Sequence, residues 1–243
     1  MKEKWWHSLV GYQIYPKSFQ DSNSDGIGDL PGILRRLDDL EELGINMIWI
    51  CPVYQSPMVD HGYDISDYTK IDPMFGSKED LERLIREAGK RGITVLMDLV
   101  INHTSDQHPW FQEALKDPEG KYGKYYIIRK GHGAVPPNNW RSLFGGSAWE
   151  RIGDSDNYYL HLFTVGQPDL NWENKELREE LYRMINEWLE LGIGGFRIDA
   201  IAHIKKDFSY ENLPPDGPDG LHAGMRWFRN VEGIGEFLRE LKE

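Results

Sequence analysis

Hydrophobic residues in this 243-residue chain lie in two kinds of segment that alternate. Short continuous apolar runs, typical of strands buried on both faces, occur at 10–15, 45–50, 93–101 and 193–198. Apolar residues at the spacing of an amphipathic helix occur at 30–43, 77–91, 174–191 and 231–243. This order predicts an α/β fold with a parallel sheet covered by helices.

Residues that cap helices lie at the ends of two of these segments. Asp29 can cap the N-terminus of the helix at 30–43, and Gly44 follows its end. Ser77 and Asp80 have the spacing of a capping box, and Gly92 follows that helix. Each of the two segments is therefore expected to be one helix.

The alternation is lost between 104 and 171. This stretch is rich in Gly, Pro, Asn and aromatic residues, and a structureless loop of that length is uncommon inside a compact domain. We therefore expect a small inserted subdomain at 104–171. Residues 1–103 would hold three strands and two helices of the main fold, and residues 172–243 its next helix, its fourth strand and a last helix. Residues 51–76 are expected to form a long loop.

No glycine-rich G-x-G-x-x-G motif follows the first run, which disfavours a dinucleotide-binding fold. A closed barrel and an open sheet both remain compatible with the pattern. In either fold, functional side chains gather at the C-terminal ends of the strands, so the chemistry is sought there.

Composition narrows the choice of ligand. The formal net charge of −12 disfavours nucleic acid and anionic membrane surfaces as partners. Nine Trp, twelve Tyr and nine Phe suit a cleft that stacks flat rings, although they equally suit a large core. The single cysteine, Cys51, excludes an internal disulfide, and no apolar run follows the N-terminus. We expect no signal peptide, no membrane span and a cytoplasmic location.

Charged residues interrupt two of the apolar runs near their ends. Asp98 precedes His103 on the third run, and Arg197 and Asp199 lie two apart on the fourth, so they share a face of their strand. A guanidinium orients a neighbouring carboxylate and favours its ionised form. Such a carboxylate suits a nucleophile at an anomeric carbon. The alternative is a purely structural Arg–Asp pair.

A loop after the first run carries oxygen side chains at alternate positions. Asp21, Asn23 and Asp25 precede a glycine at the sixth position, and Ile27 and Asp29 follow. This spacing resembles the first half of an EF-hand loop and predicts a site for one hard cation, with the backbone carbonyl of Ile27 as a further ligand. The alternative is a surface loop rich in Asx turns.

Several motifs together resemble one known family. The runs DLVINH at 98–103 and GFRIDA at 195–200 resemble signature segments of glycoside hydrolase family 13. The run QPDLN at 167–171 resembles the segment that marks its oligo-1,6-glucosidase/α-glucosidase subfamily. Further runs that match this subfamily lie at 10–19, 60–64 and 137–140. The resemblance extends over essentially the whole chain, in collinear order.

The resemblance implies a fold and a reaction. The fold would be the N-terminal half of a (β/α)8 TIM barrel with a small subdomain inserted after strand 3. The activity would be that of a retaining α-glucosidase acting on the non-reducing end of short oligosaccharides. Asp199 matches the nucleophile and Arg197 the arginine that orients it. A calcium or magnesium ion in the loop at 21–29 would be structural.

The resemblance also implies the residues that bind the sugar. His103 matches a histidine that holds the 6-hydroxyl, Tyr63 an aromatic platform under the ring, and Asp60 a carboxylate for the far hydroxyls. Asp98 matches a carboxylate near the arginine. Residues matching pocket-wall positions on the insert are Phe144, Phe163 and Gln167.

A retaining glycosidase needs two carboxyl groups about 5 Å apart. The family's acid/base glutamate follows the fifth strand, which is expected beyond Glu243. Glu232, Glu236 and Glu240 resemble the surface residues of an amphipathic helix. We therefore expect the 243-residue chain alone to be inactive and the missing C-terminal half of the enzyme to be its partner.

Three other functions are compared with this one. Trehalose-6-phosphate hydrolases share most of the motifs, but cationic residues for the phosphate are not evident. Non-catalytic transporter subunits of the family carry a membrane helix before the barrel and usually lose the nucleophile, whereas Asp199 is present. A barrel with unrelated phosphate chemistry is excluded by the motif set. Ala200 after the nucleophile is typical of relatives that cleave α-1,4 bonds, so maltose-like substrates are expected and isomaltose stays open.

Overall fold

The computed structural model describes residues 4–243, which form two compact units. Unit 1 consists of the described residues up to Gln55 with Asp67–Leu99 and Arg183–Ile198. Unit 2 consists of Ser56–Ser66, Val100–Tyr182 and Asp199–Glu243. Each unit is described by itself.

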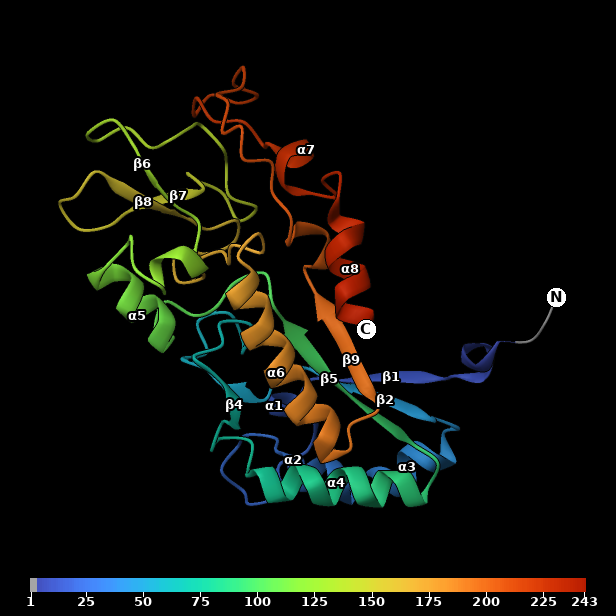
Figure 1. Ribbon diagram of the computed structural model, residues 1–243. Coiled ribbons are helices and arrows are strands. Elements are labelled where there is room, and N and C mark those ends of the chain that lie inside the picture. The colour runs from blue at the N-terminus through green and yellow to red at the C-terminus, as the bar shows by residue number, and fades with distance from the viewer. Residues whose placement is uncertain (1–3) are drawn as a thin grey trace. The chain divides into compact units, whose positions relative to one another are not determined.

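Unit 1 is built on a four-stranded sheet (Figure 1). Its strands, in the order in which they lie side by side, are β1 (Gly11–Ile14), β2 (Met47–Ile50), β5 (Thr94–Val100) and β9 (Gly195–Asp199). β1, β2 and β5 pair in parallel, and the last residues of β5 and β9 belong to unit 2. All four predicted strands are confirmed, with ends that differ by one or two residues.

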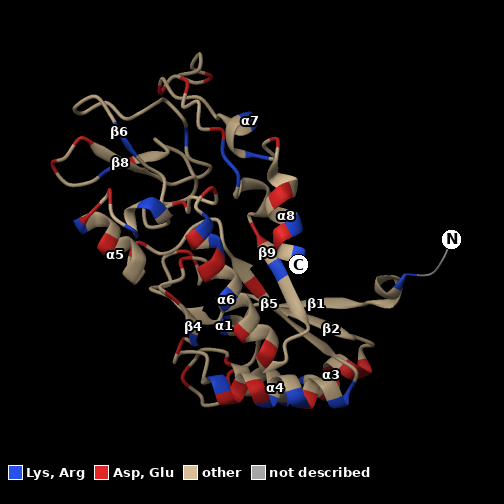
Figure 2. Cartoon of the chain, in the orientation of Figure 1, with Lys and Arg blue, Asp and Glu red and all other residues tan. Residues whose placement is uncertain are grey.

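The described part of unit 1 has six helices, and the last two begin and end within one residue of the predicted bounds. They are η1 (Trp5–Ser8), α1 (Pro16–Phe19), α2 (Leu30–Arg35), α3 (Leu37–Glu42), α4 (Lys78–Lys90) and α6 (Lys175–Leu191), which starts in unit 2. Asp29 caps α2, and the capping box of Ser77 and Asp80 is present at α4. Lys, Arg, Asp and Glu alternate along α4 in Figure 2, as expected of a solvated face.

Two predictions for unit 1 are wrong. The single helix expected at 30–43 is two helices, because Arg36 leaves the helical conformation with φ −102° and ψ 4°. The long loop expected at 51–76 contains the antiparallel strands β3 (Tyr54–Gln55) and β4 (Asp67–Ile71). β3 has only two residues, and the burial pattern along β4 does not alternate.

The core of unit 1 includes a buried tryptophan of α6. Trp188 is 2% exposed, its ring lies 5.6 Å from that of Tyr54, and its Nε1 donates to the carbonyl of Tyr68 at 2.9 Å. Fully buried aliphatic residues of α2 and α4 are Leu30, Ile33, Leu81 and Leu84. This packing fixes α6 against the β3–β4 hairpin.

Unit 2 contains a three-stranded antiparallel sheet. β8 (Asn157–Leu160) lies between β6 (Ile128–Lys130) and β7 (Trp149–Arg151). Its other elements are α5 (Pro109–Lys116), η2 (Gly123–Tyr125), η3 (Ile201–His203), α7 (Met225–Phe228) and α8 (Ile234–Lys242). The sheet and α5 lie within the predicted insert 104–171, whose boundaries stay a prediction.

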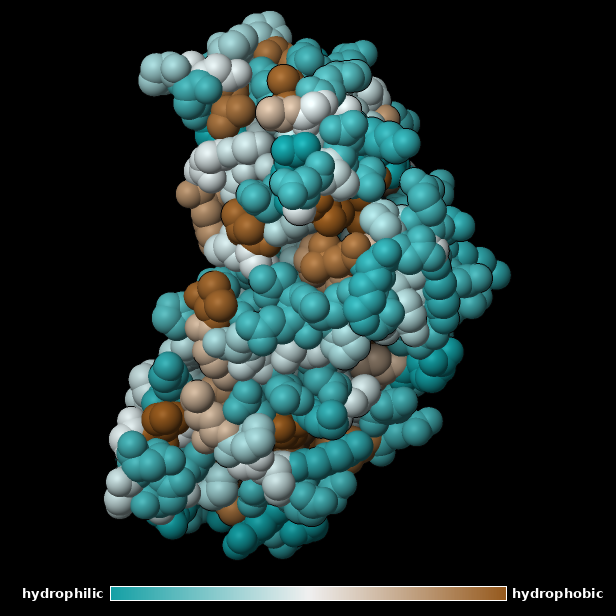
Figure 3. All heavy atoms as spheres, turned by 90° about the vertical axis from the view of Figure 1, so that its left-hand side faces the viewer, coloured by the Kyte–Doolittle hydropathy of each residue, from teal (hydrophilic) through white to brown (hydrophobic). Residues whose placement is uncertain are grey.

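The core of unit 2 joins this sheet to the C-terminal segment. Trp140, Leu160 and Leu162 are fully buried together with Phe228 of α7, and the Trp140 and Phe228 rings are 5.6 Å apart. On the face shown in Figure 3, hydrophobic residues form small patches separated by hydrophilic ones. Among residues 4–243, no helix has the length and apolarity needed to cross a membrane.

Candidate functional site

A buried carboxylate organises the loop Ser56–Ser66 of unit 2. Asp64 is 0% exposed and accepts hydrogen bonds from the Ser56 hydroxyl at 3.1 Å and from the backbone N–H of Asp60 at 2.9 Å. A carboxylate satisfied by several donors fixes the segment that supplies them. Asp64 thereby determines where Asp60 and Tyr63 lie.

Gln167 connects this loop to His103. Its Nε2 lies 2.8 Å from Asp60 Oδ2 and 3.1 Å from His103 Nε2. Its Oε1 accepts from the backbone N–H of Thr164 at 3.1 Å. Because a backbone N–H can only donate, the amide oxygen must face Thr164 and the amide nitrogen must face Asp60. Gln167 and His103 are buried, whereas Asp60 is half-buried.

An ion pair is buried behind His103. Lys206 Nζ lies 2.8 Å from Asp169 Oδ2 and 2.9 Å from Asn102 Oδ1. The Nδ2 of Asn102 lies 3.2 Å from His103 Nδ1. Lys206 is 3% exposed, and Asp169 and Asn102 are 0% exposed. Burying a lysine is tolerable only when its charge is paired and hydrogen-bonded, as it is here.

The surroundings of His103 favour the neutral form of its imidazole. Burial lowers its pKa below the ordinary value, and the negative charges of Asp169 and Asp199 act in the opposite direction. Burial also lowers the pKa of Lys206, against which Asp169 acts. The ring can therefore donate one hydrogen bond and accept another.

Aromatic rings continue the site from His103 towards the surface of unit 2. The ring centroid of Phe163 lies 5.0 Å from His103 and 5.6 Å from Phe144. Phe163 is half-buried, and Phe144 is 62% exposed. An aromatic side chain as exposed as Phe144 is available to a ligand and contributes little to the core.

Asp199 is the last residue of β9 and is half-buried. Ala200 follows it in the left-handed conformation, with φ 47° and ψ 25°. A non-glycine residue adopts this conformation rarely, and such residues are concentrated at functional sites. The backbone therefore turns sharply at Ala200, between the carboxylate and η3.

A second charged cluster lies in unit 1. Asp98 is 0% exposed, and its two oxygens lie 3.0 and 3.3 Å from Arg197 Nη1. Asp98 also accepts from Trp49 Nε1 at 3.0 Å, and the guanidinium of Arg197 lies 4.6 Å from the centre of the Trp49 ring. Asp98 and Trp49 together hold the guanidinium in one orientation.

The predicted metal ligands lie in one loop of unit 1. Asp21 accepts from three backbone N–H groups of the loop, and the one from Gly26, at 2.8 Å, is the main cause of its lowered pKa. Asp25 accepts from the backbone N–H of Ile27 at 2.8 Å and from Asn23 Nδ2 at 3.0 Å. This all-oxygen set fits a hard cation in chemical type.

Asp29 takes part in the loop differently. Its Oδ1 accepts from the backbone N–H of Gly32 at 2.6 Å and its Oδ2 from the Ser22 hydroxyl at 2.8 Å. Its capping role is therefore confirmed, and its role as a metal ligand stays a prediction. Nowhere in the described part of the chain do three His, Cys, Asp or Glu side chains form a metal-binding group.

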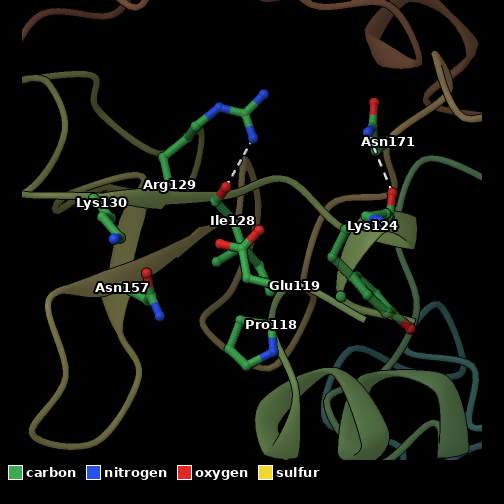
Figure 4. Close-up of a pocket in the computed structure, with 10 residues that line it drawn as sticks. Pro118, Glu119, Lys124, Ile128, Arg129, Lys130, Asn157 and Asn171 are labelled. Carbon is green, nitrogen blue, oxygen red and sulfur yellow. Dashed lines mark hydrogen bonds between the residues drawn. The ribbon is translucent and has the colours of Figure 1, made fainter. Parts of the chain in front are cut away.

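A further pocket of unit 2 is lined by cationic side chains, with Glu119 among them (Figure 4). Lys124 and Lys130 line it together with Arg129. The guanidinium of Arg129 lies 5.0 Å from the ring centre of Tyr210, so stacking already engages it. With Glu119 inside, the pocket offers no uniform positive charge for an anion.

Unit 2 thus brings together most of the predicted ligand-binding residues, namely Asp60, Tyr63, His103, Phe144, Phe163, Gln167 and Asp199. No role was predicted for Asp64, Asn102, Asp169 or Lys206. Asp64, Asn102 and Asp169 lie inside motifs that resemble the family, so the sequence already marked their positions. Lys206 follows Lys205 in a charged stretch, and such stretches are usually exposed. Its burial could therefore not be predicted from the sequence.

Comparisons with known proteins agree on one family. Residues 13–243 match the family described as "Alpha amylase, catalytic domain". An oligo-1,6-glucosidase of Bacillus cereus is 50% identical over an alignment of 245 positions, which covers 100% of this chain and 43% of that protein. A glucan 1,6-alpha-glucosidase of Streptococcus pneumoniae is 56% identical over 218 residues, 90% of this chain and 40% of that protein.

Solved structures agree with this. A trehalose-6-phosphate hydrolase from Bacillus licheniformis superimposes with a TM-score of 0.92 and 47% identity, covering 98% of this chain and 42% of that one. The chain thus spans less than half the length of the relatives it matches. The match confirms the predicted fold class, the N-terminal half of a (β/α)8 barrel with an insertion after its third strand.

Proposed function

This chain belongs to the alpha-amylase catalytic-domain family, glycoside hydrolase family 13, and from that premise we propose that it supplies the nucleophile and the glucose-binding residues of a retaining α-glucosidase. The observation that carries the proposal is the contact of Gln167 with both Asp60 and His103, at 2.8 and 3.1 Å. Asp60 and Gln167 are more than a hundred positions apart in the sequence, and Gln167 brings Asp60 together with His103. The three side chains form one polar cluster, which is proposed to bind hydroxyl groups.

Asp199 is the proposed nucleophile. Its carboxylate attacks the anomeric carbon, the bond from that carbon to the leaving oxygen breaks, and a proton passes to the leaving group. Water then cleaves the glycosyl ester and releases glucose with retained configuration. Arg197, held by Asp98, is proposed to orient the nucleophile.

The proton donor is assigned to no residue of this chain. Glu240 accepts from Arg178 Nε at 2.7 Å and from the Tyr182 hydroxyl at 3.0 Å, so it serves to attach α8 to α6. Glu232 and Glu236 are exposed. The proposal therefore requires a carboxylic acid contributed by another segment.

Sugar recognition is assigned to the cluster in unit 2. Asp60 accepts hydrogen bonds from hydroxyls, and His103 donates one to a hydroxyl oxygen. Tyr63 and the exposed Phe144 supply ring faces. Short α-glucosides are the proposed substrates, with Ala200 favouring α-1,4 over α-1,6 bonds.

The central test traps the intermediate. The complete gene product is incubated with a fluorinated α-glucosyl fluoride, and the labelled peptide is identified by mass spectrometry. We expect the label on Asp199 and expect Asp199→Asn to lower kcat for p-nitrophenyl α-glucoside by at least about 10³-fold. Asp207→Asn, an exposed carboxylate eight positions later, is the matched control. A label elsewhere, or an active Asp199→Asn variant, would refute the proposal.

Two other outcomes of the same assay identify the alternatives. Hydrolysis confined to trehalose 6-phosphate would assign the protein to the activity of its Bacillus licheniformis relative. Binding of glucosides without turnover by the complete gene product would make it a non-catalytic, glycosidase-like binding subunit.

The calcium or magnesium site is proposed for the loop at 21–29, in a structural role. We expect Ca²⁺ to raise the melting temperature and Asp21→Asn to abolish that rise, because Asp21 is the first predicted ligand. Asp38→Asn, with a carboxylate that is 81% exposed and outside the loop, is the control. An unchanged melting temperature of the parent protein at millimolar Ca²⁺ and Mg²⁺ would exclude the site.

A further inference from the structure

A chain of hydrogen bonds runs from Lys206 to His103, and each bond determines the next. An ammonium group only donates, and Lys206 Nζ lies 2.9 Å from Asn102 Oδ1. Asn102 must therefore direct its NH2 group the other way, towards His103 Nδ1 at 3.2 Å. The same NH2 group lies 3.4 Å from Asp169 Oδ1, and this contact agrees because a carboxylate only accepts.

The NH2 group of Asn102 makes His103 Nδ1 an acceptor. A neutral imidazole carries one proton, so that proton lies on Nε2. Nε2 is 3.1 Å from the carbonyl oxygen of Tyr63, which accepts from it. The Gln167 nitrogen, also 3.1 Å from Nε2, cannot donate to it as well, because a neutral ring cannot accept at both nitrogens. Its two hydrogens have other acceptors, Asp60 Oδ2 at 2.8 Å and the Tyr63 carbonyl oxygen at 3.4 Å.

We propose that Lys206 is a positioning residue that, through Asn102, holds the proton of His103 on Nε2, where the Tyr63 carbonyl accepts it and where a hydroxyl oxygen of the sugar can take the place of that carbonyl. The sugar as recipient rests on the proposed function, whereas the position of the proton does not. Asp169 completes the arrangement, because its carboxylate forms an ion pair with Lys206 Nζ at 2.8 Å and thereby holds that group in place.

The burial of these groups supports this role. A buried ion pair adds little stability compared with apolar residues of similar volume. A neutral histidine in water exchanges its proton between both nitrogens, and it would then offer the sugar a donor only part of the time. The pair of Lys206 and Asp169 removes that ambiguity.

The test is a direct observation of the tautomer. Two-bond ¹⁵N–¹H correlation spectra of the ¹⁵N-histidine-labelled 243-residue protein near neutral pH report which nitrogen of His103 is protonated. We expect the Nε2–H form alone. An Nδ1–H form, or a mixture of the two, would overturn the proposal without any variant.

Variants test the relay itself. Asn102→Asp keeps the shape but has no N–H to donate, so we expect a proton to appear on Nδ1. Lys206→Met should give a mixture of tautomers. Lys205→Met is the matched control, because Lys205 forms its ion pair with Glu173 at 2.5 Å and should leave the spectrum unchanged. A pure Nε2–H signal in folded Asn102→Asp protein would refute the relay.

Activity separates this proposal from the previous one. In the complete gene product we expect Asn102→Asp to raise KM for p-nitrophenyl α-glucoside about tenfold, which corresponds to about 1.4 kcal/mol of lost binding. An Nε2–H signal in a protein without glucosidase activity would support the relay and contradict the enzyme assignment. An active glucosidase whose His103 shows an Nδ1–H signal would support the enzyme assignment and contradict the relay.

Discussion

Single buried carboxylates hold the functional residues in place. Asp64 fixes its own loop, which carries Asp60, by accepting hydrogen bonds from within that loop. Asp98 holds Arg197 and Asp169 holds Lys206, and both of these contacts join residues far apart in the sequence. The family resemblance implied that Asp98 lies near the arginine, and its charge within an apolar strand drew attention to it. The role of Lys206 could not be predicted, because burial of a lysine depends on tertiary packing that a local pattern does not contain.

Removing the charge of Asp98 should lower the free energy of unfolding. In Asp98→Asn, an amide NH2 group replaces an oxygen that accepts from Arg197 or Trp49, so one donor loses its partner. We expect the free energy of unfolding to fall by roughly 2 kcal/mol, measured by urea denaturation. Asp38→Asn, which weakens the exposed pair with Arg91, should change it by less than about 0.5 kcal/mol. Equal effects of the two variants would contradict this account.

Elements with a strong local signal were predicted best. The capping box at Ser77, the cap at Asp29 and the apolar stripe of α6 are short-range features that the sequence states directly. The break between α2 and α3 at Arg36 could not be predicted, because no Pro or Gly lies at that position. The strands of unit 2 have only three or four residues, too few for a period to appear. α5 begins with Pro109, a start signal hidden in an irregular segment.

The N-cap of α4 contributes measurably to the free energy of unfolding. Ser77→Ala removes the acceptor for the backbone N–H of Asp80, leaving an unsatisfied donor at the helix start. We expect a loss of about 1 kcal/mol in the free energy of unfolding. Ser209→Ala, at an exposed serine outside any helix, should have no measurable effect and serves as the control. No loss in Ser77→Ala would contradict the capping role.

The loop at 213–222 should loosen in acid. Arg141 binds Asp219 through two nitrogens, at 2.6 and 2.9 Å, and these bonds are the main cause of the lowering of the Asp219 pKa to about 2. A lowered carboxylate pKa contributes stability that is fully present above the ordinary value of about 4 and is lost as pH falls towards 2.

Amide hydrogen exchange, corrected for the intrinsic effect of pH, checks this. Protection of the loop should fall between about pH 4 and pH 2. Arg141→Met should lower protection at neutral pH and remove the acid-dependent step. Arg151→Met, whose guanidinium binds only within its own turn, is the control. A step that persists in Arg141→Met would refute the assignment.

At the scale of the whole molecule, charge and sheet topology decide how the chain behaves in solution. The net charge of −12 disfavours association, whereas β1 and β9 are the two edges of the four-stranded sheet. Unpaired strand edges promote pairing with other chains. Tyr12 of β1 is 38% exposed, and Val10 before it is 50% exposed.

A charge on the β1 edge should therefore reduce self-association of the 243-residue chain. We expect Tyr12→Lys to lower the concentration-dependent increase in sedimentation coefficient, because lysine at a sheet edge opposes strand pairing. Val135→Lys, at an apolar residue that is 59% exposed and outside every strand, is the control for added charge. Equal effects of both variants would show that net charge alone is responsible.

The left-handed backbone at Ala200 also limits how this protein can be engineered. An amino acid branched at Cβ resists that conformation, and glycine accepts it without cost. Exchanges at position 200 that aim to alter bond selectivity will therefore change folding energetics at the same time. Libraries randomised there need a thermal screen beside the kinetic one, since a slow variant can be merely unfolded.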